Sequence, residues 1–211
     1  MESIGCKVHA HVQDADIDKV KMNKAVFLDR DGTINSEVGY LSRTDQIQIL
    51  DGVTEALNTF KEQGYINIII TNQSGVARGY YTEEQLAEIH REFMNLLQIN
   101  GKSLVDGIYY SPYHTEGTVE EYKKNSSCRK PGTGMIEEAV KNHGIDLTKS
   151  FLIGDSMADM QCAENAGIRK ILVLTGYGKK TAEECVKTGI KPDFTAENIR
   201  KAADYILSKK D

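Results

Sequence analysis

The sequence predicts an α/β fold in which helices cover both faces of a mainly parallel sheet. Three observations support this prediction. Short apolar segments alternate with amphipathic segments along most of the chain. The apolar segments are near-continuous runs rich in Val, Ile and Leu, which is typical of parallel strands that are buried on both faces. Polar motifs follow directly after several of these runs, and in such sheets ligands bind at the carboxyl ends of the strands.

The first half of the chain contains two predicted strands and two predicted helices. KAVFLD (24–29) is a short apolar run that ends in aspartate, and INIIIT (66–71) is rich in β-branched residues, so both fit buried strands. Between them, 51–65 has apolar residues at helical spacing and ends at a glycine. The segment 82–101 opens with a capping box and ends at an Asn-Gly pair, so it is predicted to be helical over this length.

The second half of the chain repeats this alternation. GIYYS (107–111), SFLIGD (150–155) and KILVLT (170–175) are short apolar runs and are predicted to be strands. The segments between and after them have helical spacing and end at glycine or at polar residues. The helices are predicted over 134–145, 157–167, 181–189 and 196–210.

Length, charge and cysteine usage narrow the class of protein. The 211 residues suit one domain, which we place at 24–211. Residues 1–23 show a brief alternation at 8–12 that is compatible with a short strand, but otherwise no clear period, and are interpreted as an appended arm. The net charge of −5 disfavours a protein that binds nucleic acid by neutralising phosphates. We expect a cytoplasmic protein without a membrane partner, because the sequence has no apolar span, no signal-peptide core and four scattered cysteines without a CxxC pair.

Two aspartates lie one residue apart at the end of the first strand, in FLDRDGTIN (27–35). Carboxylates this close repel each other unless a cation lies between them, and Mg²⁺ typically binds one or two carboxylates together with a substrate phosphate. Asp155 ends a later strand, and Asp159 lies on the same helical face four residues further on. The sequence therefore predicts a magnesium site formed by Asp29, Asp31 and Asp155, and leaves open whether Asp159 touches it.

The same positions suit phosphoryl transfer. Asp29 can act as the nucleophile that forms an aspartyl-phosphate. Asp31 can protonate the leaving alcohol and later activate water. Thr71 and Asn72, after the second strand, offer hydrogen bonds to the phosphate, and Lys130 offers positive charge to the transferring phosphoryl group.

Each of these residues alone has a simpler explanation. Asp and Gly in a loop are most often turn formers. An aspartate before a helix is most often an N-cap, and a single lysine is most often a solvated surface residue. The combination favours chemistry, because four elements of complementary character follow strand ends in an order that one sheet can bring together.

The pattern resembles the haloacid dehalogenase (HAD) superfamily of phosphotransferases. Four features carry the resemblance: DxDGT after one strand, Thr after the second, a later Lys, and GD-x₃-D after another strand. Over 24–207 the chain is also similar to the heptose-bisphosphate phosphatases of this superfamily and to the related histidinol-phosphate phosphatases. The segments that carry this similarity are FLDRDGTIN (27–35), EVGY (37–40), TNQSGVARGYYTEEQ (71–85), DGIYYSPYH (106–114), GTVEEYKKNSSCRKPGTGM (117–135) and GDSMADMQCAENAG (154–167).

The resemblance implies an Mg²⁺-dependent phosphomonoesterase with a Rossmann-like three-layer sandwich and no separate cap domain. It makes Asp29 the nucleophile and a metal ligand. It makes Asp31 the acid and base, with its backbone carbonyl facing the metal, and Asp155 the third ligand. Thr71 and Lys130 would stabilise the phosphoryl group. The implied substrate-binding residues are Glu37, Val38, Gly39, Tyr40, Asn72, Gln73, Ser74 and Arg129. Arg129 is expected to hold the phosphate that is not cut, because Arg presents a bidentate fork.

The sequence departs from the family in two places. Many members hold the long loop, here 111–133, with a structural zinc bound by Cys-x-His and Cys-x-Cys. The corresponding residues in this chain are Ser111, Tyr113, Ser126 and Cys128. One cysteine cannot form a four-coordinate N/S site, so no structural zinc is predicted and Cys128 is interpreted as a small loop residue. Ser156 stands where related enzymes often have a lysine that touches the substrate.

The expected function is removal of the 7-phosphate from D-glycero-D-manno-heptose 1,7-bisphosphate by a monomer. A phosphatase for histidinol phosphate or another small sugar phosphate is the alternative within the same class. A phospho-acceptor signalling domain shares acidic strand ends, a Thr or Ser and a Lys, but Asp31 two residues after Asp29 favours turnover. A non-catalytic protein on a phosphatase scaffold is disfavoured, because each core catalytic position is filled.

Overall fold

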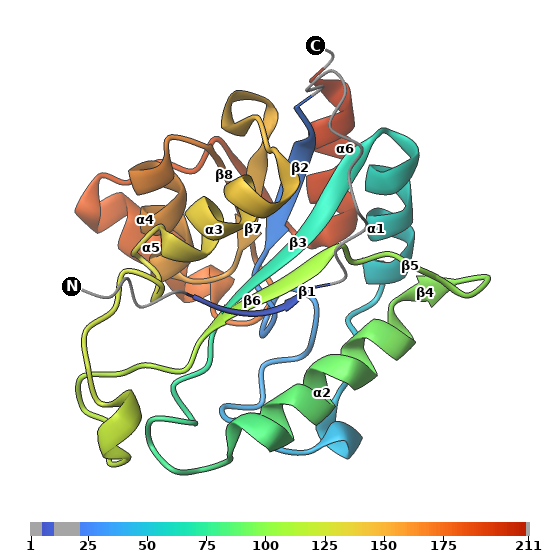
Figure 1. The fold of residues 1–211 in the computed structure, drawn as a ribbon. Coiled ribbons are helices and arrows are strands. Elements are labelled where there is room, and N and C mark those ends of the chain that lie inside the picture. Colours follow the sequence, from blue (N-terminus) through green and yellow to red (C-terminus); the bar gives the residue numbers. More distant parts are fainter. Residues whose placement is uncertain (1–5, 11–21, 210–211) are drawn as a thin grey trace.

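The structure is a computed structural model that describes residues 6–10 and 22–209. Its centre is a seven-stranded sheet with the order β1-β6-β3-β2-β7-β8-β9, and β4 and β5 form a separate two-stranded hairpin (Figure 1). The strands are β1 (Lys7–Ala10), β2 (Lys24–Leu28), β3 (Tyr65–Asn72), β4 (Gln98–Ile99), β5 (Lys102–Ser103), β6 (Gly107–Ser111), β7 (Phe151–Gly154), β8 (Arg169–Val173) and β9 (Phe194–Ala196). The α-helices are α1 (Val53–Glu62), α2 (Glu83–Leu96), α3 (Gly134–His143), α4 (Met157–Ala166), α5 (Gly178–Thr188) and α6 (Ile199–Ser208).

The sheet is parallel from β6 through β9, and only the edge strand β1 runs antiparallel to its neighbour. The central strand β2 is buried from Ala25 to Leu28. Such strands need cover on both faces, and helices supply it on both sides of the sheet (Figure 1). The predicted α/β fold with a mainly parallel sheet is confirmed.

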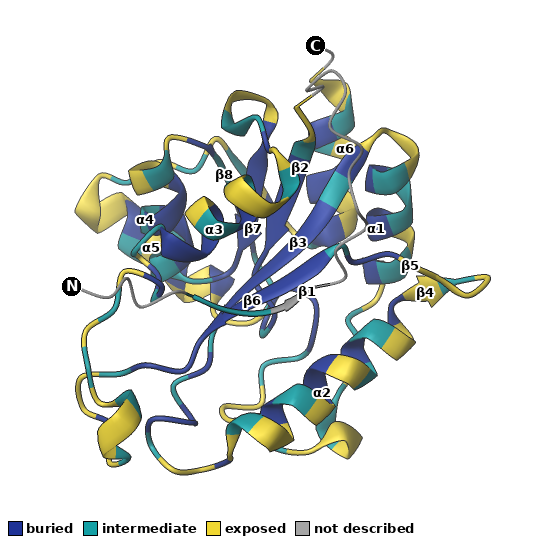
Figure 2. Cartoon of the chain, viewed as in Figure 1, coloured by how far each residue is buried: buried dark blue, intermediate teal, exposed yellow. Residues whose placement is uncertain are grey.

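Two hydrophobic clusters fill the space between the sheet and the helices. On one face, Leu57 of α1, Phe93 of α2 and Ile206 of α6 belong to one cluster. On the other face, Met135 of α3 and Ala163 of α4 belong to the second. Figure 2 shows the central strands as the most buried part of the chain, with exposed residues on the outward sides of the helices. The sheet is therefore the middle layer of a three-layer sandwich.

The carboxyl ends of three central strands meet at one edge of the sheet. Leu28, the last residue of β2, pairs with Ile69 of β3 on one side and with Ile153 of β7 on the other. The residues that follow these strands, Asp29 and Asp155 among them, therefore emerge side by side. This register positions the candidate site.

The helix predicted over 82–101 is shorter in the structure. It begins after Thr82, whose capping box is present as predicted, but it ends at Leu96. Asn100 and Gly101 have φ angles of 51° and 73° and form the turn of the β4–β5 hairpin. An Asn-Gly pair favours a two-residue hairpin turn because both central residues need positive φ. Interpreting this pair only as a helix stop was wrong.

The remaining predicted elements agree with the structure within a few residues, but β9 was not predicted. It has only three residues and follows a polar segment, so its apolar signal is too short to distinguish it from a loop. Among the residues that the structure describes, no helix has the length and apolar character that a membrane span requires.

The N-terminal segment contributes to the sheet and to a disulfide. Residues 7–10 form β1, in agreement with the alternation at 8–12. Cys6 is bonded to Cys128, with 5.4 Å between the two Cα atoms. The interpretation of Cys128 as a small loop residue was therefore wrong, and a separation of 122 residues gave no local signal of the pairing. The rest of the predicted arm, 1–5 and 11–21, lies outside the described residues.

Candidate active site

A cleft of about 290 Å³ opens at the carboxyl ends of β2, β3 and β7. Its walls combine acidic, amide, hydroxyl and phenol side chains with one lysine. The lining residues are Asp29, Asp31, Glu37, Gly39, Tyr40, Thr71, Asn72, Gln73, Ser74, Tyr81, Lys130, Asp155, Ser156 and Tyr177. The polar motifs that follow separate strands in the sequence thus meet in one cavity.

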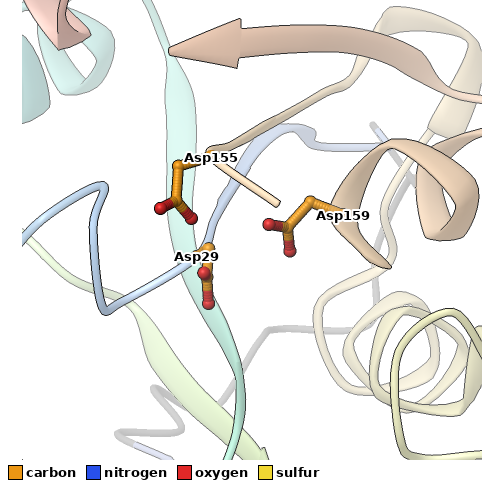
Figure 3. A group of neighbouring side chains, drawn as sticks. All are labelled: Asp29, Asp155 and Asp159. Atoms are coloured by element: carbon orange, nitrogen blue, oxygen red, sulfur yellow. The ribbon is translucent and has the colours of Figure 1, made fainter. Parts of the chain in front are cut away.

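Three carboxylates converge at the base of this cleft. Asp29 follows β2, Asp155 follows β7, and Asp159 lies in the first turn of α4. One oxygen from each lies within 4.8 Å of the others, and Figure 3 shows the groups turned toward one another. The backbone packs closely here, because a Cβ on Gly32 would lie 2.1 Å from Asp155 Oδ2. Gly32 also has a φ of 79°, so a glycine is needed at this position on both grounds.

Lys130 provides the positive charge beside these carboxylates. Its ammonium donates hydrogen bonds to Asp29 Oδ1 at 2.8 Å, to Asp159 Oδ1 at 2.5 Å and to the carbonyl oxygen of Ile70 at 2.9 Å. Burial alone would lower the pKa of Lys130, but Asp159 and Asp29 outweigh it and raise this pKa. The three hydrogens of the ammonium are therefore directed to the nucleophile candidate and its surroundings.

One lysine does not balance three buried carboxylates. Burial and the charge of Asp159 raise the pKa of Asp29 well above its ordinary value. Burial and Asp159 also raise the pKa of Asp155, to about 7. Both shifts mean that negative charge is unfavourable here without a further cation. Hard oxygen ligands in this arrangement fit Mg²⁺.

The hydrogen bonds separate the three carboxylates into two kinds. Both oxygens of Asp159 are occupied, Oδ1 by Lys130 and Oδ2 by the backbone nitrogen and the hydroxyl of Ser156. Asp155 Oδ2 accepts a bond from the backbone nitrogen of Tyr177 at 2.7 Å. Within the described part of the chain, Asp29 Oδ2 and Asp155 Oδ1 have no hydrogen-bond donor. These two oxygens are available to a cation, whereas Asp159 instead fixes Lys130.

Asp31 is held at the side of the cleft by two neighbours. The guanidinium of Arg30 donates from Nε to Asp31 Oδ1 at 3.1 Å and from Nη2 to Oδ2 at 2.8 Å. Gln73 Nε2 donates to Oδ2 at 3.0 Å. Arg30 itself is only 1% exposed, and its Nη1 lies 3.3 Å from His90 Nε2. Asp31 is thus oriented by a buried, bidentate partner.

The residues that follow β3 line the cleft. They also form hydrogen bonds that position other residues of the site. Gln73 Nε2 donates to Thr71 Oγ1 at 2.8 Å, and Gln73 Oε1 accepts from the hydroxyl of Tyr81 at 2.6 Å. The amide of Asn72 pairs with the backbone of Lys130, accepting at 2.9 Å and donating at 3.0 Å. Since Thr71 Oγ1 accepts from Gln73, its own hydrogen is free to face a ligand.

Two arginines lie close together beside the cleft. Burial and the neighbouring Arg78 guanidinium lower the pKa of Arg129, and the phenol of Tyr40, a lining residue, opposes this. Arg129 Nη1 donates a long bond of 3.4 Å to the carbonyl of Tyr113. Arg78 lies 3.4 Å from the exposed carboxylate of Glu116. Guanidinium groups with so little neutralising charge beside them suit the binding of an anion.

Known proteins share this sequence and fold. The sequence profile of HAD-hydrolase-like proteins matches residues 127–202. The D-glycero-beta-D-manno-heptose-1,7-bisphosphate 7-phosphatase of Photorhabdus laumondii is 47% identical over 161 residues, which are 76% of this chain and 85% of that protein. The chain belongs to the haloacid dehalogenase superfamily.

Two solved structures agree with this membership in the HAD superfamily. A D,D-heptose 1,7-bisphosphate phosphatase from B. bronchiseptica, complexed with magnesium and phosphate, has a TM-score of 0.76 and 29% identity, covering 89% of this chain and 99% of that chain. A HAD-like phosphatase from Mesorhizobium loti has a TM-score of 0.78 and 28% identity, covering 99% of this chain and 94% of that chain. The resemblance inferred from the sequence motifs is confirmed, and the relatives are phosphatases.

Most residues that the sequence suggested for the site of this HAD protein line the one cleft. Two do not. Val38 is 42% exposed and is not among the lining residues, and Arg129 lies beside the cleft near Arg78. Glu37 lines the cleft, and its Oε1 accepts a bond from the backbone nitrogen of Gly39, which shapes the turn that carries Tyr40.

Sequence reasoning missed several residues of this HAD site. Arg30 lies inside the DRDG motif, and a charged residue at the end of a buried strand was a signal that its side chain needs a partner. Tyr81 and Tyr177 line the cleft. Tyr81 lies within TNQSGVARGYYTEEQ but was given no role, and Tyr177 belongs to a loop with no motif of its own. Arg78 lies shortly after TNQSG in the sequence. No sequence pattern indicates that the folded loop brings it near Arg129.

Proposed function

We propose that this protein is an Mg²⁺-dependent phosphomonoesterase that removes the 7-phosphate of D-glycero-D-manno-heptose 1,7-bisphosphate through an aspartyl-phosphate on Asp29. One observation carries the proposal. The carboxylate of Asp29 faces the cleft with one oxygen on Lys130 and the other without a donor among the described residues, and Asp31 stands two residues further on. A nucleophile beside a cation, with an acid and base in reach, suits turnover of a phosphate ester.

In the first step, a carboxylate oxygen of Asp29 attacks the phosphorus atom of the 7-phosphate. The bond between phosphorus and the C7 oxygen breaks, and protonated Asp31 gives its proton to that oxygen. Thr71 is placed to donate a hydrogen bond to a phosphoryl oxygen, while Lys130 holds the nucleophile in line.

In the second step, the Asp31 carboxylate takes a proton from water, and the water oxygen attacks the same phosphorus atom. The bond between phosphorus and Asp29 breaks, which releases inorganic phosphate and restores both carboxyl groups. Arg30 and Gln73 keep Asp31 in one orientation for both proton transfers. This use of one residue as acid and then base is ordinary general catalysis.

Asp29, Asp155 and the backbone carbonyl of Asp31 are the residues that we propose hold Mg²⁺. When bound, the ion would neutralise the phosphate and lower its repulsion from Asp29. Asp159 is excluded from this set because its two oxygens are committed to Lys130 and Ser156. We propose no structural zinc in addition, because the Cys128 sulfur is bonded to Cys6.

The choice of substrate rests on two supports. Relatives that are 47% and 29% identical to this chain over the aligned residues carry the name of a heptose-bisphosphate phosphatase. The Arg78–Arg129 pair beside the cleft suits a second phosphate on the same substrate. Tyr40 and Tyr177, both about half exposed at the cleft, offer aromatic faces to a sugar.

We further propose that the protein works as a monomer in the cytoplasm. Disulfides are rare in that compartment, so the Cys6–Cys128 bond has to resist reduction there. Asp29, Asp31 and Lys130, the groups that carry the proposed chemistry, line one cleft of the same chain, so a single copy supplies each of them. A bisphosphate is too highly charged to cross a bilayer unaided, and the reaction therefore belongs to the compartment in which the sugar is phosphorylated.

The test is phosphate release from a panel of compounds with Mg²⁺. The panel holds both anomers of heptose 1,7-bisphosphate, histidinol phosphate and simple sugar monophosphates. We expect one heptose bisphosphate to have a kcat/KM at least about tenfold above the others, as a site with a polar subsite for each substrate group would give. Removal of Mg²⁺ by a chelator should abolish release.

Two Asp→Asn variants serve as the matched pair. Asp29→Asn should lose activity, whereas Asp45→Asn, on an exposed turn, should retain it. A preference for histidinol phosphate would support the phosphatase mechanism but would contradict the heptose bisphosphate as substrate. A stable acyl-phosphate without phosphate release would instead identify a signalling domain.

A further inference from the structure

The loop between β6 and α3 carries two residues of the site. We call residues 112–133 the β6–α3 loop; one short 3-10 helix, Glu120–Tyr122, is its regular element. Arg129 and Lys130 lie near its end, immediately before α3. A loop of this length requires contacts along it to keep such residues in place.

A disulfide holds the end of the β6–α3 loop. Cys128, two residues before Lys130, is bonded to Cys6 at the start of β1. Cys128 is 1% exposed and lies in the cluster that includes Met135 of α3. Cys6 and Val8 pack against the same cluster. The first residues of β1 are thus fixed to the loop on the α3 side of the sheet.

An ion pair holds the middle of the loop on the other side. Lys7 Nζ lies 2.5 Å from Glu83 Oε2, at the start of α2. The same carboxylate oxygen accepts from the hydroxyl of Tyr122 in the loop at 2.8 Å. The second oxygen accepts from Tyr110 of β6 at 3.0 Å. Glu83 therefore joins β1, β6, α2 and the loop.

The strand β1 explains how neighbouring residues reach both sides. Successive side chains of a strand point to opposite faces. Lys7 pairs with Tyr110 in the antiparallel register, so Cys6 and Lys7 stand at the edge of the sheet where the loop begins. Figure 1 shows β1 beside β6 at this edge. The beginning of β1 and the residue before it, Cys6, are therefore linked to the loop on both faces of the sheet.

We propose that Cys6 and Lys7 are positioning residues, and that β1 clamps the β6–α3 loop so that Arg129 stays beside the cleft. A dithiol would open this clamp: its thiolate attacks the Cys6 sulfur, the bond to the Cys128 sulfur breaks, and a second thiolate of the dithiol then displaces Cys6. The protein gains two electrons and two protons, which leaves Cys6 and Cys128 as thiols, and the dithiol becomes a disulfide.

The contacts of the two site residues predict which kinetic constant changes. Lys130 keeps three ammonium bonds and its pairing with Asn72, all independent of the disulfide. Among the residues that the structure describes, the Arg129 side chain has one hydrogen bond, the long one to Tyr113 of the same loop. Opening the clamp should therefore raise the KM of a substrate with a second phosphate and change kcat less.

The match with the solved structure from Mesorhizobium loti covers 99% of this chain, so the alignment extends over β1.

The experiment compares oxidised wild type, dithiothreitol-treated wild type, Cys6→Ala and Lys7→Ala. Cys185→Ala is the matched control, because Cys185 is a free buried cysteine that packs with Met160 and Leu172 on α4 and β8. We measure kcat and KM with a heptose bisphosphate and with a sugar monophosphate. Brief trypsin digestion, read by mass spectrometry, reports cleavage after Lys123, which is exposed in the loop.

The clamp variants and the reduced protein should show a bisphosphate KM about tenfold higher, within the range that a displacement of about 1 Å causes. Their KM for the monophosphate should change little, and cleavage after Lys123 should be faster. Cys185→Ala should match wild type in all three measurements. The dithiothreitol effect should reverse when the thiols are reoxidised.

Two results would overturn the clamp. One is alkylation of both Cys6 and Cys128 in protein kept free of reductant. The other is a Cys6→Ala variant with wild-type KM and wild-type cleavage. Because the kinetic part rests on the proposed function, a wild type without phosphatase activity would count against that function, while the cleavage rates would still decide on the clamp.

Discussion

Asp159 illustrates how hydrogen bonds assign a role that residue type does not. It belongs to the same buried group as Asp29 and Asp155, and spacing alone allowed it to be a metal ligand. Its oxygens are committed to Lys130 and Ser156, so it orients the lysine instead. The difference between ligand and positioning residue can be measured.

The variants Asp159→Asn and Asp155→Asn should therefore separate the orientation of Lys130 from the binding of Mg²⁺. The Asp159 variant loses the charged partner of Lys130, and we expect kcat to fall about 100-fold, as for loss of one aligned charged contact. Its Mg²⁺ dependence should stay close to wild type. The Asp155 variant should need far more Mg²⁺. A titration of initial rate against Mg²⁺ measures both, and an Asp159 variant with strongly weakened Mg²⁺ dependence would show that Asp159 is a ligand.

Arg30 is a second residue whose effect should come from geometry. Arg30→Lys keeps the charge but loses the two-pronged contact with Asp31. We expect kcat to fall roughly 10- to 100-fold with little change in KM, because the acid and base are then poorly oriented. Arg91→Lys, on the exposed side of α2, is the control. Equal kcat values for the two variants would show that Arg30 does not orient Asp31 for catalysis.

Mg²⁺ binding should depend on pH through the carboxyl group of Asp155. Burial and Asp159 raise the pKa of this group to about 7 in the metal-free protein. Below that pH the metal must displace a proton, so the apparent Mg²⁺ affinity should fall as the pH drops through about 7. Calorimetry in two buffers of different protonation enthalpy should detect proton release on binding. Affinity that is constant between about pH 6 and about pH 8 would contradict this assignment.

At the scale of elements, the local signals predicted most strands and helices but not β9, the β4–β5 hairpin or the partners of each element. The capping box at Thr82 correctly started α2. The Asn100-Gly101 pair was informative too, but it signalled a hairpin rather than a helix stop. The disulfide joins residues 122 apart, and no local pattern encodes such a distance.

Glu83 should make the attachment of β1 sensitive to acid. Burial alone would raise the pKa of Glu83, but the bonds from Lys7, Tyr122 and Tyr110 outweigh it and lower this pKa below 4.5. The folded state thus favours the carboxylate, so its contribution to stability is present above pH 4.5 and is lost as the pH falls through the lower, folded pKa. Glu83→Gln should destabilise the protein by roughly 1 kcal/mol at neutral pH and by less in acid.

Thermal unfolding of Glu83→Gln at several pH values checks this expectation. Glu88→Gln, an exposed acid on the same helix, is the matched control. The difference between Glu83→Gln and wild type should shrink toward acid, whereas Glu88→Gln should stay near wild type throughout. If the difference in thermal stability between Glu83→Gln and wild type did not change with pH, Glu83 would act through the shape of its side chain rather than through its charge.

At the scale of the whole molecule, the sequence predicted the sheet and most of the cleft for one physical reason. Buried parallel strands are apolar along their whole length, so their ends are visible, and residues after those ends must share one edge. Asp29, Thr71 and Asp155 were found in this way. Tyr177 follows β8 in the short connection to α5, but no motif marks a tyrosine there. The position of Arg78 depends on how the loop between β3 and α2 folds, which periodicity does not encode.

The proposed mechanism depends most on a covalent aspartyl-phosphate at Asp29. The direct measurement is rapid quenching of a turning-over reaction with borohydride, followed by mass spectrometry of the peptide that contains FLDRDGTIN. Borohydride reduces an acyl-phosphate to the alcohol, so Asp29 should become homoserine, with one oxygen fewer and two hydrogens more, only when substrate and Mg²⁺ are both present. Phosphate release with Asp29 unmodified, or with the modification on Asp31, would contradict the proposed mechanism.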